Sequence, residues 1–256
     1  MNNIIVRLLN IVLPKNFKRI ICLHSISNNY FSLSKFKALV KVLKLLDITF
    51  LSLDDIMNNN LPGRFISFTF DDGYKDNIET LMPFLINEKI PSLIFICPYL
   101  LNRGYDIDLI SEKKLYEAKL ATETDIKLWL DNNFAIGYHT LNHVDLFDAS
   151  DDEIKNDIEV GIKYLEQKFD YKVNNFAYPF GHLPKNRELL FNLLEKNKVT
   201  YAYTVIWGDI NFESTPYLIN RVCIGDFDSL YKATLKAVGV LDFYFKMKHA
   251  NEKNRI

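Results

Sequence analysis

The chain has 256 residues, of which 48% are hydrophobic and 14% aromatic, so it can bury a core large enough for a sizeable α/β domain. Its 31 basic and 32 acidic side chains leave a formal net charge of -1, which argues against a nucleic-acid partner. Cys22, Cys97 and Cys223 lie far apart in apolar runs, which favours reduced, buried thiols over a disulfide framework.

Residues 1–18 form an apolar N-terminal segment that Arg7 and Asn10 interrupt. The apolar stretch is too short to span a bilayer, and no small-residue cleavage site follows it. Two interpretations stay open: the segment lies on a membrane surface, or it forms an amphipathic helix that packs on the domain.

Short apolar runs alternate with helical patterns along the chain, which predicts parallel β/α units. Buried strands are expected at residues 19–24, 65–70, 92–97, 134–139, 174–179, 201–206 and 218–224. Helices are expected at residues 34–46, 76–87, 122–130, 151–169 and 185–196. Seven strands in this arrangement indicate a barrel.

No linker or repeat divides the chain, so residues 19–226 are predicted to form a single barrel domain. Residues 98–120, part of which has helical character, are a candidate element at the rim of the barrel. Residues 227–256 are predicted to form an amphipathic helix, over 229–248, followed by a polar tail. Packing of this helix on the barrel is the first interpretation, and membrane contact is the alternative.

Chemically useful side chains follow several predicted strands. In a β/α barrel the reactive groups lie at the carboxyl ends of the strands. His24, Asp71, Asp72, His139, the turn at residues 178–181 and Trp207 all occupy such ends. Adjacent carboxylates after an apolar strand are costly unless a positive charge compensates them. The pair Asp71 and Asp72 therefore predicts a cation at this rim.

His139 and His143, in HTLNH, are four residues apart, a spacing that brings two imidazoles to one side of a turn. Two histidines at this spacing, taken alone, are more often surface or core residues that do not bind a metal. Together with a carboxylate from a neighbouring strand, the two histidines would form a divalent metal site with coordination positions left for water and substrate.

TFDDG, HTLNH and YPFG, in this order, resemble the motifs of the polysaccharide deacetylase family, the carbohydrate esterases with a NodB-type domain. The resemblance covers roughly residues 20–225. It implies a distorted (β/α)7-type barrel that removes N-acetyl groups from amino sugars. It also implies that Asp72, His139 and His143 bind one divalent metal ion and that Asp71 is the general base. Zinc is our first choice of metal, and cobalt, nickel and iron also suit these ligands.

The third motif and its surroundings supply the remaining expected contacts to substrate. A backbone N–H near Tyr178 would be a second donor to the oxyanion, with Pro179 fixing the loop and Phe180 in the aromatic position of the motif. Taken alone, YPFG is more simply interpreted as an ordinary proline turn. Trp207 is either a core residue or a wall beside the acetyl methyl group.

Two departures from the common family pattern are visible. Ala177 stands where an arginine is usual, and a late Leu-x-His that would supply the general acid is missing. These departures resemble the branch that acts on poly-N-acetylglucosamine-type polymers, in which the acid histidine comes from the first strand. That histidine would be His24, and Arg221 would orient Asp71 in place of the missing arginine.

The sequence thus predicts a metal-dependent N-deacetylase whose substrate is an N-acetylated sugar, either a glycan or a lipid- or nucleotide-linked precursor of a surface polysaccharide. Two alternatives stay open: a catalytically silent carbohydrate-binding homologue, and a barrel hydrolase of a non-sugar amide. Reduced thiols and no visible signal peptide lead us to expect a cytoplasmic location, at the inner face of the membrane. The sugar and the oligomeric state stay open.

Overall fold

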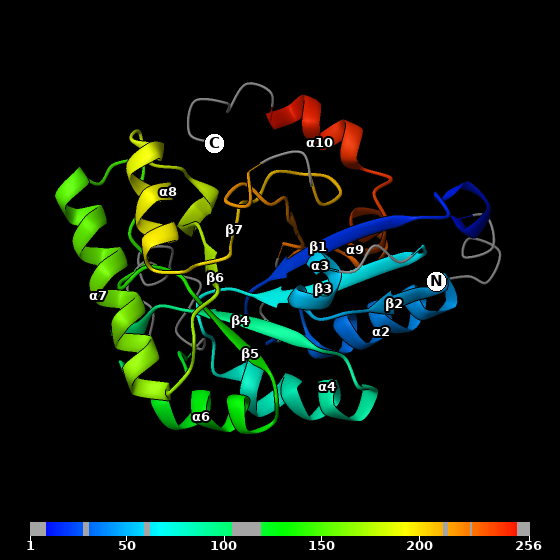
Figure 1. Ribbon diagram of the computed structural model, residues 1–256. Coiled ribbons are helices and arrows are strands. Elements are labelled where there is room, and N and C mark those ends of the chain that lie inside the picture. The colour runs from blue at the N-terminus through cyan, green and yellow to red at the C-terminus, as the bar shows by residue number, and fades with distance from the viewer. Residues whose placement is uncertain are drawn as a thin grey trace.

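The computed structural model describes residues 9–27, 31–58, 62–103, 119–211, 215–225 and 227–249. Helices surround a curled sheet in Figure 1. The strands are β1 (Phe17–Leu23), β2 (Ile48–Phe50), β3 (Arg64–Phe70), β4 (Ser92–Ile96), β5 (Ala135–Tyr138), β6 (Asn175–Ala177), β7 (Tyr201–Tyr203) and β8 (Val222–Cys223). The α-helices are α2 (Leu33–Leu45), α3 (Leu53–Asn58), α4 (Met82–Glu88), α6 (Glu123–Asp131), α7 (Asp151–Phe169), α8 (Arg187–Lys196), α9 (Leu230–Ala237) and α10 (Asp242–His249), with short helical turns η1 (Asn77–Leu81), η2 (Pro98–Leu100) and η3 (Pro179–Gly181).

The strands form one parallel sheet in the order β7-β6-β5-β4-β3-β1-β8, and β2 pairs with the first half of β3. Ile219, shortly before β8, makes a parallel bridge to Tyr203 in β7, whereas β8 itself pairs with β1. One segment therefore contacts both ends of the sheet and closes it. The expected distorted (β/α) barrel, built as a single domain, is confirmed.

The two faces of the barrel wall have separate cores, because side chains alternate between the faces along each strand. Outward side chains such as Ile21, Phe68 and Ile94 belong to the large core that the surrounding helices cover. The second core holds inward side chains of six strand segments together with residues of α3: Ile20, Leu53, Ile56, Phe65, Leu93, Phe95, Ala177, Tyr203 and Ile219. The interior below the rim is thus filled mainly by these side chains.

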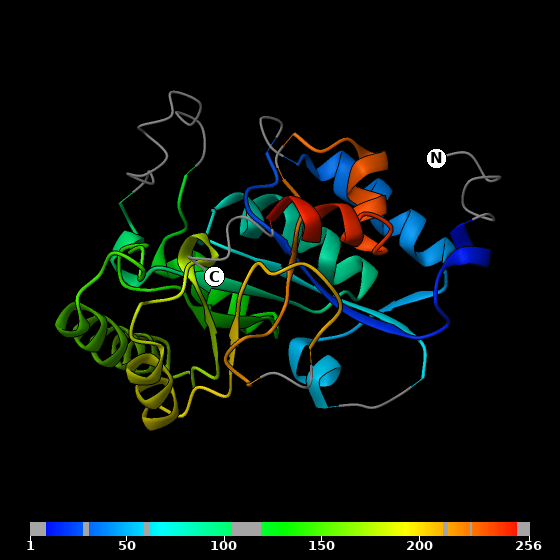
Figure 2. The same cartoon turned by 90° about the horizontal axis from the view of Figure 1, so that it is seen from above.

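The structure differs from the sequence prediction at the carboxyl-terminal helix. Two helices, α9 and α10, replace the single helix expected at 229–248, and the chain turns between them at Gly239, whose φ is 84°. A Cβ at this position would lie 2.9 Å from Nη1 of the buried Arg19, so both the backbone conformation and the available space favour glycine. Helix α9 packs beside α2, as Figure 2 shows.

At the other end of the chain, residues 9–12 are helical and Leu9 and Leu13 are buried, while Ile11 and Val12 are exposed. Most of the segment at 98–120, which was expected to lie at the rim, falls outside the described residues. Among the described helices, none is both long enough and apolar enough to cross a bilayer.

Helix α7 packs against β5 at Gly161. An ideal Cβ on Gly161 would lie 1.9 Å from the hydroxyl oxygen of Tyr138, and this hydroxyl donates a hydrogen bond to the carboxylate of Asp157. The close approach of helix and strand thus depends on the absence of a side chain.

We expect Gly161→Ala to lower the free energy of unfolding by about 1–3 kcal/mol, because the overpacking at Tyr138 outweighs the gain in helix propensity. Asn156→Ala, on the exposed face of the same helix, is the control and should leave stability equal or slightly higher. Urea denaturation of both variants measures the difference, and a Gly161→Ala protein as stable as the wild type would contradict this packing.

Candidate active site

Asp71 and Arg221 form a bidentate ion pair inside the barrel at its rim. Arg221 Nη1 donates to Asp71 Oδ1 at 2.7 Å and Nη2 donates to Oδ2 at 2.8 Å, and both side chains are buried. Burial alone would raise the pKa of Asp71, but the Arg221 guanidinium and the nearby imidazoles hold it below its usual value. Asp71 is therefore an ionised carboxylate of fixed orientation.

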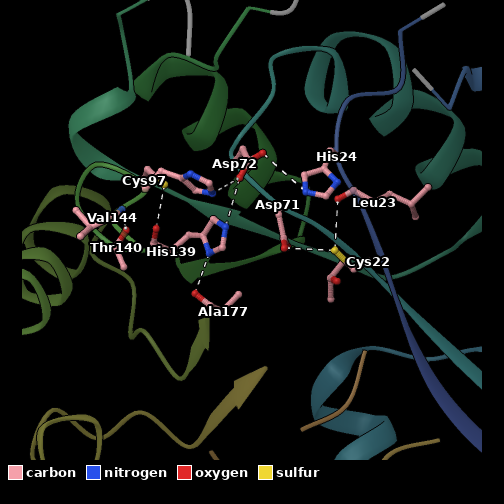
Figure 3. A network of polar contacts seen from close by, with 12 residues as sticks. Cys22, Leu23, His24, Asp71, Asp72, Cys97, His139, Thr140, Val144 and Ala177 are labelled. Atoms are coloured by element: carbon pink, nitrogen blue, oxygen red, sulfur yellow. Dashed lines mark hydrogen bonds and ion pairs between the residues drawn. The ribbon is translucent and has the colours of Figure 1, made fainter. Parts of the chain in front are cut away.

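Asp72 lies between the two histidines of HTLNH. Its Oδ1 is 3.3 Å from Nε2 of His139 and 3.3 Å from Nε2 of His143. Burial would raise the pKa of Asp72, but His143 and the other neighbouring imidazoles lower it overall. Nδ1 of His139 lies 2.8 Å from the carbonyl oxygen of Ala177 and donates a hydrogen bond to it, which leaves Nε2 to act as a ligand (Figure 3).

These three residues fit a divalent metal ion. Asp72 Oδ1 is buried and has no hydrogen-bond partner among the described residues, a costly state that a cation would relieve. Ligand atoms at about 2.0–2.2 Å from a tetrahedral zinc ion lie about 3.3–3.6 Å apart. The separations of 3.3 Å between Asp72 Oδ1 and the two Nε2 atoms fall at the lower end of that range. The ligand atoms of Asp72, His139 and His143 also lie within 4.8 Å of one another.

The backbone at the site is in an unusual conformation. Asp72, Thr140, His143 and Phe180 all have positive φ values, of 71°, 62°, 58° and 59°. Such left-handed conformations cost free energy for residues with a Cβ and occur often at functional sites. They turn these side chains away from the directions that regular strands or helices would give them.

Asp157 of α7 holds the loop between the two histidines. Its Oδ1 accepts a hydrogen bond from the Tyr138 hydroxyl, and its Oδ2 accepts one from the backbone N–H of Leu141 at 2.9 Å. Burial raises the pKa of Asp157 to about 6, although both hydrogen bonds oppose the shift. This support was not predicted, because a single acid in a polar helix has no motif that identifies it.

His24 extends from the end of β1 toward the same cluster (Figure 3). Its Nε2 lies 3.9 Å from Asp72 Oδ2, and its side chain is 36% exposed, so it can reach both the cluster and solvent. Asp76 fixes the loop that follows, because its carboxylate accepts hydrogen bonds from the Ser25 hydroxyl and the Ile26 N–H. Sequence reasoning missed Asp76 although it lies only five residues after Asp71.

The YPFG turn differs from the expectation at Tyr178. Its side chain points to the outer face of the wall, where the hydroxyl donates to the Tyr217 carbonyl at 2.8 Å. Its N–H donates to the Tyr203 carbonyl, and the N–H groups of the two residues after Phe180 also donate to carbonyls, while Pro179 has none. The Phe180 N–H is the remaining backbone donor of this loop. The Phe180 ring is 52% exposed and lies 4.5 Å from the His143 ring.

Trp207 is partly buried against the large core, and its ring lies 5.1 Å from the ammonium of Lys236. Lys236 in turn donates a hydrogen bond to the Cys223 carbonyl at 3.1 Å. Through Lys236, Trp207 is thus located near the end of β8. The structure brings together His24, Asp71, Asp72, His139, His143 and Arg221, with the Phe180 ring beside His143.

We expect the purified protein to retain one divalent ion after dialysis, and His139→Ala/His143→Ala to lose it because two of three ligands are gone. Elemental analysis of the dialysed proteins measures the ion. His182→Ala is the matched control, since His182 is a rim histidine that pairs with Asp145 instead. Equal metal content in the double variant and the wild type would contradict the assignment.

Comparison with known proteins is consistent with this geometry. The chain is 28% identical over 218 residues to the poly-beta-1,6-N-acetyl-D-glucosamine N-deacetylase of Staphylococcus aureus strain MSSA476, covering 81% of this chain and 72% of that protein. The fold of the present chain matches that of IcaB from Ammonifex degensii with a TM-score of 0.70 and 19% identity. The match covers 87% of this chain and 97% of the IcaB chain. Streptococcus pyogenes deacetylase PplD, solved in complex with acetate, also gives a TM-score of 0.70, with 19% identity over 88% and 99% of the chains.

The family model for polysaccharide deacetylase matches residues 58–202, more than half of the chain. This range includes the paired aspartates, both histidines of HTLNH and the YPFG turn. The chain belongs to the polysaccharide deacetylase family.

Proposed function

We propose that this protein is a metal-dependent N-deacetylase that hydrolyses the acetamide of an N-acetylated amino sugar and releases acetate. The observation that carries the proposal is the convergence of His139 Nε2 and His143 Nε2 on Asp72 Oδ1, each at 3.3 Å, beside the ion-paired Asp71. A catalytically silent homologue would not need a buried ligand oxygen, Asp72 Oδ1, without a hydrogen-bond partner among the described residues. Nor would it need the adjacent Asp71 carboxylate to be held in one orientation by Arg221.

Each residue has a distinct role in this proposal. A divalent cation held by Asp72, His139 and His143 would polarise the acetyl carbonyl as a Lewis acid. Asp71 accepts the proton of the attacking water at its carboxylate, and Arg221 keeps that carboxylate ionised and aimed.

Two further groups complete the reaction. The Phe180 N–H donates to the carbonyl oxygen as negative charge develops on it. His24 donates a proton from Nε2 to the departing amine nitrogen, which the partial exposure of its side chain allows. The Phe180 ring shields His143 from water.

We propose a β-1,6-linked N-acetylglucosamine polymer, or a lipid- or nucleotide-linked precursor of a surface glycan, as the substrate. The similarity to the staphylococcal enzyme supports the first choice. Acetate release from the oligosaccharide, from a lipid-linked sugar and from a nucleotide sugar, measured side by side, tests the class. Turnover of none of the three, with metal bound, would overturn the proposal.

The proposed location is the cytoplasm, at the inner face of the membrane. The three cysteines are free thiols, which supports a reducing compartment. Ile11 and Phe243, 79% and 74% exposed, supply apolar side chains for contact with a lipid surface. Fractionation of cells that express the protein tests this location.

Asp71→Asn should retain the metal and reduce acetate release by roughly a hundredfold or more, because the amide cannot accept the proton while the metal ligands remain. Parallel measurements of metal content and of kcat distinguish loss of the base from loss of the site. Turnover close to that of the wild type would assign the base to another group.

His24→Ala should also retain metal and fold, and kcat should fall roughly a hundredfold because the departing amine loses its proton donor. KM should change little. The control is His182→Ala, which removes an imidazole from the rim without touching the Asp72 cluster, and its turnover should stay near normal. If the two variants behaved alike, the acid would not be His24.

A further inference from the structure

His24 lies in a loop that is anchored to the segment following β3. Directly before His24, the Leu23 carbonyl accepts a hydrogen bond from the Asp71 N–H at 2.9 Å. Nε2 of His24 itself lies 3.9 Å from Asp72 Oδ2, at the edge of the ligand cluster (Figure 3). Because this side chain is 36% exposed, it could also turn toward solvent, so the place of the imidazole depends on what holds the residues after it.

Asp76 provides the anchor on the other side of His24. Its carboxylate accepts hydrogen bonds from the Ser25 hydroxyl and, at 3.2 Å, from the Ile26 N–H. The Ser25 hydroxyl oxygen in turn accepts a hydrogen bond from the Ser27 N–H at 3.3 Å. One carboxylate therefore stabilises the three residues that follow the proposed acid.

Asp76 makes these contacts although a closer partner is at hand. It is the N-cap residue of η1, a position where an aspartate side chain commonly accepts a hydrogen bond from an N–H of the first turn. Its side chain makes no such capping bond within the described chain. The carboxylate instead reaches residues 25 and 26, about 50 positions earlier in the sequence. Its contacts thus serve the loop after β1 and not its own helical turn.

We propose that Asp76 is a positioning residue for the proton donor: it holds the backbone after His24 so that the imidazole stays within reach of the departing amine. The inference rests on the proposed role of His24 as the acid. Asp76 acts through the loop and not on the reacting atoms. The segment from Asp71 to Asp76 would then fix the base, one metal ligand and the acid together.

A double-mutant cycle between Asp76 and His24, in the metal-loaded full chain, tests this role by kinetics. Asp76→Ala should keep the metal and KM, and should lower kcat roughly tenfold to a hundredfold because the acid is misplaced. In the His24→Ala background the same substitution should change kcat by less than about twofold, since no acid remains to be misplaced. An equal loss in both backgrounds, or no loss in either, would overturn the inference.

Asp76→Asn separates anchoring from charge. The asparagine oxygen can accept from the Ile26 N–H, and the Ser25 hydroxyl can accept from the new amide, so the loop stays anchored and kcat should remain within about threefold of the wild type. A loss as large as that of Asp76→Ala would overturn the anchoring role. Glu79→Ala is the matched control, because this exposed acid of η1 pairs with Lys75, and it should leave kcat unchanged.

A spectroscopic measurement tests the anchoring without turnover. The chain has five histidines, so NMR of isotope-labelled imidazoles gives few signals, and the signal lost in His24→Ala identifies His24. In the zinc-loaded protein, Asp76→Ala and the milder Ser25→Ala should both shift the His24 signal, and Asp76→Asn should shift it less. The signals of the metal ligands His139 and His143 should stay in place.

The two measurements separate a failure of this inference from a failure of the proposed function. Normal turnover of His24→Ala would overturn the proposed acid. Impaired turnover of His24→Ala, combined with an unchanged His24 signal in both Asp76→Ala and Ser25→Ala, would overturn only the anchoring by Asp76.

Discussion

A positive charge buried inside the barrel determines how the rim is organised. The guanidinium of Arg221 has no exposure to solvent, and a charge in that position is stable only with a partner of opposite sign. Asp71 provides both hydrogen-bond acceptors of a bidentate pair, and the Thr69 hydroxyl and the Thr204 carbonyl accept two further hydrogen bonds from the guanidinium. Removing one member of such a pair typically costs about 3–5 kcal/mol. Breaking the pair would therefore destabilise the closed barrel, and the intact pair fixes the carboxylate proposed as base.

Most of the site could be predicted because barrel geometry converts positions in the sequence into positions in space. Strand ends are recognisable from apolar runs, so the sequence alone assigns His24, Asp71 and His139 to one rim. The period of two along a strand then decides which side chains point inward. Applied strictly, it also separates Tyr178 from its neighbour Ala177, which belongs to the interior core while the tyrosine belongs to the outer one.

The remaining features depend on contacts that a linear pattern does not carry. β2 has three residues, which is too short for a periodic signal, and α3 follows it directly. The amphipathic pattern at 229–248 continues through Gly239, although the chain turns there with a positive φ and Arg19 of β1 packs against the glycine. Asp76 and Asp157 each accept a hydrogen bond from a backbone N–H in a loop distant in the sequence. The residues next to each aspartate in the sequence do not indicate which loop it contacts.

The closure of the sheet also sets the order in which the molecule can be completed during synthesis. β8 has two residues and follows directly after Arg221, while its partner β1 and the next strand of the sheet, β3, lie in the first third of the chain. Until the ribosome has released the segment around Ile219 to Cys223, Asp71 lacks its counter-charge and the wall lacks its last strand. The nascent chain therefore carries an open sheet with an uncompensated Asp71, and the ion pair at the rim forms only when the final strand is inserted.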